Sequence, residues 1–230
     1  MSSVSKDFQQ RRMEVLLYFR FVIDTCEGRI TIPSHTKSKV LQVYAQEELL
    51  KTLKASCYLL LYNLVESTLR GLIQQIFDEF KTQNIRYDDC RQEVKKIVVL
   101  NFRRRNFDDQ LVQKLADLAI DIINESFDPD KLFSGNVDAK TIRETAEEYG
   151  FAPPATKATW TLREVKENRN DLAHGSKSFS EVGRDVTPQK LKMAYRQMTR
   201  VLSSTIKNVN TYVEKRHYLA STLTPTAPTP

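Results

Sequence analysis

The chain has 230 residues, of which 40% are hydrophobic and 28% are charged, and this suits one folded domain with a sizeable core. Only six residues are glycine, well under the usual ~7%, which disfavours turn-rich β-sandwiches and doubly wound α/β folds. The 35 basic and 29 acidic side chains give a formal net charge of +6, which permits a polyanionic partner without requiring one.

The first twelve residues are polar and predict no secretory leader. No run of about 18 apolar residues predicts a membrane span, so we expect a cytoplasmic protein with no membrane partner. The three cysteines, Cys26, Cys57 and Cys90, are widely separated, which disfavours both a disulfide framework and a zinc site. We therefore expect free thiols, no metal and no cofactor.

Apolar residues recur at helical spacing along most of the chain. The first predicted helix covers residues 5–27 and ends at Gly28. The second covers residues 40–83, because apolar side chains recur every three or four positions from Leu49 to Phe80. At 1.5 Å per residue this helix would be roughly 65 Å long, so it is expected to span the domain.

Further helices are predicted over residues 88–100, 108–126, 138–149, 161–173 and 188–213. The last has a strong start signal, because Thr187 can cap it and Pro188 fits its first position. The sequence thus predicts an all-α, multi-helix bundle with one very long helix. An N-terminal helix and loop over residues 1–38 is expected to pack on a helical domain over 39–218, and residues 219–230 form a disordered tail.

The segment around His174 carries the chemistry, since glycine-rich phosphate loops, HExxH and GxSxG motifs are missing from the sequence. Arg169 falls within the apolar stripe of its helix, so its charge needs a partner or an anionic ligand. Asn170 and His174 are four residues apart and share a face. On an ideal helix Arg169 and His174 point ~140° apart, so they converge only if the helix breaks near Gly175 or if two copies meet across a dimer axis.

Residues 169–174, RNDLAH, resemble the motif of the HEPN superfamily: an arginine, a polar residue, and a histidine a few positions later. Residues 134–139, 149–151 and 175–188 resemble one bacterial branch of that superfamily, found in defence and toxin–antitoxin systems. The resemblance implies a metal-independent endoribonuclease that acts on RNA as a homodimer. It also implies a toxin or effector role, with a cognate antitoxin or defence-system partner protein.

The same resemblance implies that Arg169, Asn170 and His174 are catalytic. RNA supplies its own nucleophile, the 2′-hydroxyl, so cleavage needs a proton acceptor and donor, which histidine provides near neutral pH. Arginine would stabilise charge on the phosphate, and Asn170 would hold the histidine or the phosphate. Three alternatives stay open: a catalytically silent HEPN module that binds RNA, nucleotide or a partner protein, a plain helical scaffold, and a simple helix cap at His174.

Two basic groups are weaker candidates for RNA binding. The first lies between two phenylalanines and comprises Arg103, Arg104 and Arg105. The second forms one face of the last helix and comprises Lys192, Arg196 and Arg200. For both groups an ordinary solvated surface is the alternative. Trp160 is expected in the core or at the helix entry.

Overall fold

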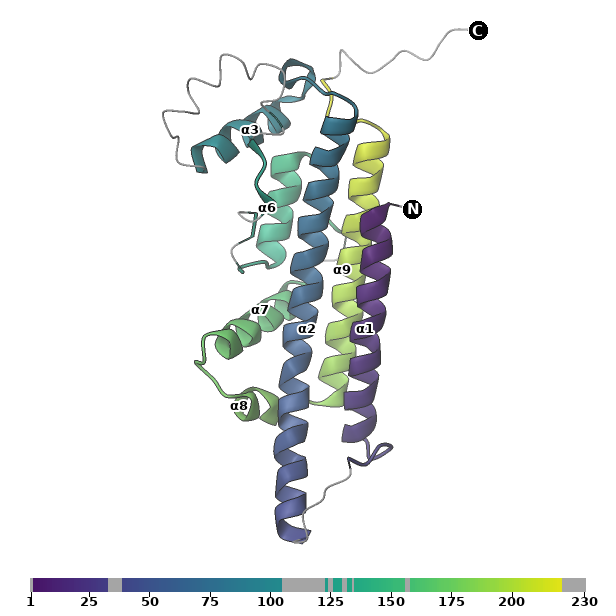
Figure 1. Ribbon diagram of the computed structural model, residues 1–230, viewed down its shortest axis with the longest axis vertical. Coiled ribbons are helices and arrows are strands. Elements are labelled where there is room, and N and C mark those ends of the chain that lie inside the picture. The colour runs from purple at the N-terminus through teal and green to yellow at the C-terminus, as the bar shows by residue number, and fades with distance from the viewer. Residues whose placement is uncertain are drawn as a thin grey trace, which may run out of the picture.

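Three long helices lie side by side in the computed structural model: α1 (Ser3–Cys26), α2 (Lys39–Thr82) and α9 (Pro188–Glu214) (Figure 1). The structure describes residues 2–32, 39–104, 123, 126–129, 132–133, 135–155 and 158–220. Over these ranges the chain forms helices and no strand, apart from a single antiparallel bridge between Cys90 and Leu219. The predicted all-α fold is confirmed, and so is the very long helix, since α2 has 44 residues.

Shorter helices line α2 on the side away from α1: α6 (Ala139–Tyr149), α7 (Thr159–Ala173) and α8 (Phe179–Arg184) (Figure 1). Because α2 packs against α1, α7, α8 and α9, it is the central element of the bundle. A short 3-10 helix, η1 (Tyr87–Asp89), follows α2, and α3 (Gln92–Arg104) lies beside the C-terminal end of α2, where it contacts α6.

Side-chain caps explain where several helices begin. Thr187 accepts a hydrogen bond from the Lys190 N–H at 3.2 Å, and Pro188 occupies the first turn, as the sequence predicted. The Asp138 carboxylate accepts from two N–H groups in the first turn of α6, and Gly150 ends that helix in the left-handed conformation. The start and end of α6 therefore agree with the sequence prediction.

Some predicted boundaries are wrong. The helix expected over 88–100 is replaced by η1, an extended step at Cys90, and α3, because the N–H of Arg91 donates to the Tyr218 carbonyl instead of continuing a helix. Helix α8 was not predicted at all. The helix expected over 108–126 falls almost wholly outside the described residues, and so do 221–230 of the proposed tail. The division of the chain at residue 38 stays a prediction.

The core runs the length of the bundle between the three long helices. Its largest fully buried side chains include Phe8, Phe19, Leu61, Leu64, Leu72, Ile76 and Tyr212. The three cysteines are free, as predicted, and Cys57 and Cys90 are buried. Trp160 is 72% exposed, so the expectation of a core position is wrong. No helix in the described part of the chain is both long and apolar enough to cross a membrane.

Candidate functional site

The inner face of α7 fixes the place of Arg169. Leu162, Val165 and Leu172 are buried against the bundle, and Arg169 lies in the same stripe with its side chain half-buried. The apolar spacing therefore predicted correctly that this arginine points inward. A buried stripe of this kind sets the rotation of the helix, so the arginine is aimed by packing as well as by its own contacts.

The Arg169 guanidinium has three contacts within its own subunit. Its Cζ lies 4.4 Å from the centroid of the Tyr62 ring. Its Nη1 donates to Asn170 Oδ1 at 2.9 Å and to the Gly135 carbonyl at 3.4 Å. A cation over an aromatic face is attracted by the ring quadrupole, and the two oxygens complete the polar contacts. The partner that this charge was expected to need is therefore provided within the subunit.

None of these contacts neutralises the arginine. Among the residues that the structure describes, no carboxylate lies within ion-pair distance of Arg169, although ion pairs are common elsewhere on the surface. The guanidinium is thus held in place by a ring, an amide and a carbonyl, and it keeps its full positive charge. This arrangement suits a site that binds an anionic ligand.

The partners of Arg169 are themselves fixed by neighbouring groups. The Tyr62 hydroxyl accepts a hydrogen bond from the Val137 N–H at 3.0 Å, and burial raises the pKa of Tyr62 to about 12, so the phenol stays neutral. Gly135 has a φ of +75°, and a Cβ there would come within 3.0 Å of Arg169 Nη1. Only glycine both tolerates this backbone and leaves room for the guanidinium.

Asp138 joins the Gly135 segment to α7. Its Oδ1 caps α6 by accepting from the Lys140 and Thr141 N–H groups, and its Oδ2 pairs with Lys166 Nζ at 2.6 Å. Lys166 lies one turn before Arg169 on α7. The segment 135–138 is therefore tied to both α2 and α7, which sets the distance between the Gly135 carbonyl and the arginine.

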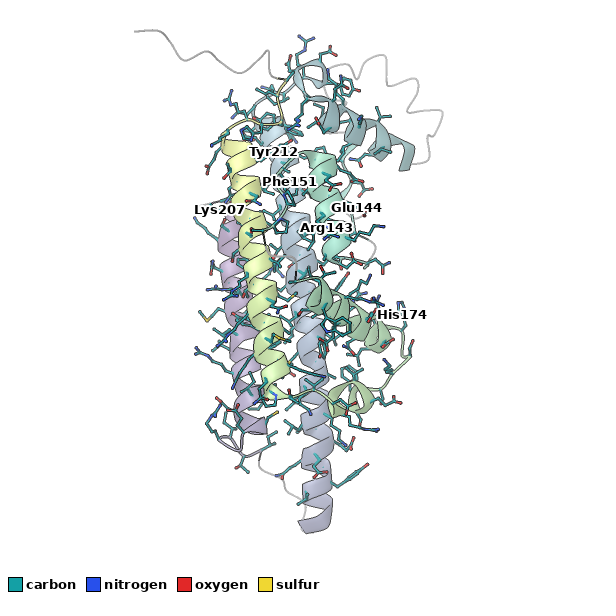
Figure 2. All side chains as sticks on the ribbon, turned by 180° about the vertical axis from the view of Figure 1, so that it is seen from behind. Arg143, Glu144, Phe151, His174, Lys207 and Tyr212 are labelled. Atoms are coloured by element: carbon teal, nitrogen blue, oxygen red, sulfur yellow. The ribbon has the colours of Figure 1, made fainter. Side chains whose placement is uncertain are left out.

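His174 has a very different setting. It caps the C-terminus of α7, where its backbone N–H donates to the Asn170 carbonyl at 2.9 Å, and its side chain is exposed. Figure 2 shows it at the outer end of α7, away from the three long helices. Gly175 then adopts a φ of +69°, and Lys177 closes the turn through an ion pair with Asp171 at 2.6 Å.

One subunit does not bring Arg169 and His174 together. Arg169 faces the bundle and His174 points into solvent, and within the described ranges the imidazole makes no hydrogen bond or ion pair. Asn170 contacts the arginine through its side chain and not the imidazole. The geometry agrees with the ~140° that an ideal helix places between the two positions.

A comparison with protein families decides where the chain belongs. The family model described as HEPN_MAE_28990-like HEPN matches residues 1–218. The chain belongs to the HEPN family. Searches of curated proteins and of solved structures give no match. HEPN domains are often ribonucleases, and the family also allows a nucleotide-binding module, so family membership alone leaves both open.

The other predicted site residues lie apart from the HEPN motif. Lys192, Arg196 and Arg200 are exposed on α9, where Lys192 pairs at 2.8 Å with Glu27, the C-cap residue of α1. Gln197 of α9 bonds to Thr161 in the first turn of α7, whereas His174 lies at the C-terminal end of α7. Arg105 falls outside the described residues, as do the side chains of Arg103 and Arg104.

Sequence reasoning missed the residues that hold the HEPN arginine. Tyr62 lies within an apolar run of α2 that reads as core, and nothing in the local pattern links it to α7. Gly135 offered a signal, because it lies in a chain that is poor in glycine and in a segment that resembles the family. Over the described residues, no group of three or more histidine, cysteine, aspartate or glutamate side chains forms a metal site.

Proposed function

We propose that the protein is a metal-independent endoribonuclease that works as a homodimer, with Arg169, Asn170 and His174 as its catalytic residues. The observation that carries the proposal is the Arg169 guanidinium, which is held by Tyr62, Asn170 and Gly135 and has no carboxylate partner among the described residues. A positive charge held ready in this way suits stabilisation of a phosphate whose charge rises in the transition state.

The chemistry needs only proton transfers and charge stabilisation. The 2′-hydroxyl of RNA attacks the adjacent phosphorus as its proton passes to a base, and the 5′-oxygen of the next nucleotide leaves as it takes up a proton. Histidine performs both transfers near neutral pH. The products are a 2′,3′-cyclic phosphate and a 5′-hydroxyl. Asn170 acts here as the residue that orients the arginine, since its Oδ1 accepts from Nη1.

The directions of the two side chains support the proposed homodimer. Because Arg169 faces inward and His174 outward, a second subunit is needed to supply the missing group at one phosphate. Leu172 is only 9% exposed and packs in the core, so the inner stripe of α7 is not the contact surface. We infer that the contact instead involves the exposed His174 end of α7, on the side of that helix that also carries Trp160, which is 72% exposed.

A dimer built on that face should dissociate when Trp160 is changed to Asp, because a charge then replaces the large exposed apolar group. Light scattering measures the mass, and Met193→Asp, a like change at an exposed site on α9, serves as the control. A wild-type protein that cleaves RNA as a monomer would overturn the dimer.

The biological role that goes with this activity is the effector of a toxin–antitoxin or anti-phage system, kept in check by a cognate partner protein. Its support is the resemblance of the Gly135 and Tyr149 segments to such proteins. The second candidate is a silent HEPN module that binds RNA or nucleotide. The exposed imidazole of His174, with no hydrogen bond or ion pair to a described residue, favours that alternative, because an acid–base residue is usually oriented by a neighbour.

The test is cleavage of a fluorescent single-stranded RNA in EDTA by the purified chain, with the product ends identified by mass spectrometry. Cleavage in EDTA that leaves 2′,3′-cyclic phosphate ends supports the proposal. Cleavage that stops in EDTA and returns with Mg²⁺ contradicts it. RNA that is bound and never cut at any protein concentration selects the silent module.

A further inference from the structure

A groove with a volume of about 640 Å³ runs along α2 beside Arg169. Its floor is a polar stripe at positions i, i+4, i+7 and i+11 of α2, formed by Asn63, Ser67, Arg70 and Gln74. The N-terminal part of α1 forms one edge, and Arg169 lies on the other. Eleven residues of helix correspond to roughly 16 Å, so the groove is longer than one phosphate requires.

The charges of the groove are unevenly balanced. Of its three arginines, Arg11 pairs with Asp7 at 2.8 Å and Arg70 pairs with Glu66 at 3.1 Å. Arg70 also donates to the Pro129 and Phe133 carbonyls, which fixes its guanidinium. Three arginines against two carboxylates leave one positive charge, and it falls on Arg169. An anionic group entering the groove would therefore be drawn to that end.

The rest of the floor offers neutral hydrogen-bonding groups. The Asn63 side chain is exposed and bonds to no residue that the structure describes. Within the described residues, Ser67 bonds only to a carbonyl of its own helix. Gln74 donates from its amide N–H₂ to Asp78, and its carbonyl oxygen bonds to no described residue, so that oxygen can accept from a ligand. Amides and hydroxyls of this kind match the base edges and 2′-hydroxyls of single-stranded RNA.

We propose that this groove binds the single-stranded RNA next to the cleaved phosphate. One phosphate lies at Arg169, and the neighbouring nucleotides follow Asn63, Ser67 and Gln74 along α2. The inference rests on the proposed function, since it uses Arg169 as the phosphate ligand. The proposed groove adds a path for the substrate on the inner side of α7. Residues of α2 and α1 form this path, whereas the HEPN motif belongs to α7.

Substitutions at Asn63 can add either a negative or a positive charge to the groove, so RNA binding can be tested in both directions. In a His174→Ala background, which prevents cleavage, Asn63→Glu should weaken binding of a fluorescein-labelled single-stranded oligoribonucleotide, and Asn63→Lys should tighten it. We expect about fivefold in each direction, the scale of one exposed charge contact. Asn63 is exposed, so neither change should disturb folding. Ser203→Glu and Ser203→Lys, at an exposed position on α9, are the matched controls.

Fluorescence anisotropy at fixed salt decides between the outcomes. Opposite shifts at position 63 with little change at position 203 support the groove. Equal shifts at the two positions, or none at 63, overturn it. Adenosine monophosphate that binds as tightly as the RNA, with the same dependence on residue 63, also overturns it, because the site is then one for free nucleotides.

The failures of the two proposals are distinguishable. If the wild-type chain cuts RNA and its KM is the same in Asn63→Glu and Asn63→Lys, the nuclease stands and the groove is wrong. If the wild-type chain cuts nothing while binding still depends on residue 63, the groove stands and the nuclease is wrong.

Discussion

Arg169 and His174 lie five residues apart on the same helix, yet the fold treats them in opposite ways. The arginine is half-buried and held by contacts from α2, from the segment before α6 and from its own neighbour. The histidine is exposed at a helix cap, and its side chain makes no hydrogen bond or ion pair with the residues that the structure describes. One half of the motif is therefore held by contacts within the subunit, whereas the other half is exposed to solvent.

The largest effects should separate activity from stability. His174→Ala and Arg169→Ala should each lower RNA cleavage by ~10²-fold or more, the scale of losing an acid–base or charge-stabilising group. Only Arg169→Ala should also destabilise the fold, by about 1 kcal/mol, because the Tyr62 ring loses its cation. Single-turnover cleavage and urea unfolding measure the two quantities. Full activity in His174→Ala would remove it from the site.

A substitution at Gly183 tests the region around His174, which comprises the turn after it and α8. Here α8 crosses α2 so closely that a Cβ would overlap the Lys51 carbonyl, so Gly183→Ala should destabilise by about 1–3 kcal/mol. Hydrogen exchange should rise in α8 and in the turn after His174, and it should stay low around Tyr62. Gly71→Ala is the control, because its Cβ would meet Val4 methyls at an ordinary 3.5 Å. Similar losses in the two variants would contradict this account of the crossing.

Gly135 tests the arginine side. Gly135→Ala should strain a backbone with positive φ and also displace the Arg169 guanidinium, with a loss of cleavage of roughly tenfold. Gly28→Ala shares the strain, since its φ is +73°, but no atom lies within 4 Å of the added Cβ. Backbone strain should cost both variants about 1 kcal/mol, and only Gly135→Ala should also lose activity. Equal activities would show that Gly135 is needed only for its backbone conformation and not for the position of Arg169.

The smallest predicted effect concerns pH. Burial raises the pKa of Asp138, but the Lys166 ammonium and the Thr141 N–H outweigh burial, so the pKa lies below its ordinary 3.8. A lowered pKa in the folded state stabilises above the ordinary pKa, and that contribution is lost as pH falls through the lowered value. Asp138→Asn should therefore be less stable than wild type at neutral pH, and the gap should close below about pH 3.8. Urea unfolding across this range measures it. A gap that persists in acid would contradict the ion pair.

Local signals in the sequence account for much of the fold. The apolar spacing of α2, the Thr187 cap and the inward direction of Arg169 were all predictable, because each depends on residues within a few turns. Helix α8 was missed although its signal was present: Ser178 and Glu181 form a capping box, with Ser178 Oγ accepting from the Glu181 N–H at 3.2 Å. Six helical residues are too few to show an apolar period, so the capping box was the one local signal that could have predicted α8.

Other parts depend on contacts between distant segments. The break at Arg91 arises because its N–H bonds to Tyr218, and the ring under Arg169 comes from another helix. Periodicity tells which side of a helix turns inward, but it does not tell which residue of another helix it meets. The partner of Arg169 was therefore beyond sequence reasoning, even where the need for one was clear.

The continuous length of α2 limits how the family can vary by insertion and deletion. On α2, Lys51 contacts α8 and Tyr62 lies under Arg169. These two residues are eleven positions apart, which is three turns of an ideal helix to within about 20°. One residue added between them would rotate one docking point by about 100° relative to the other and shift it by about 1.5 Å. Related chains should therefore accept length changes in the loops that join the helices and keep this stretch of α2 at constant length.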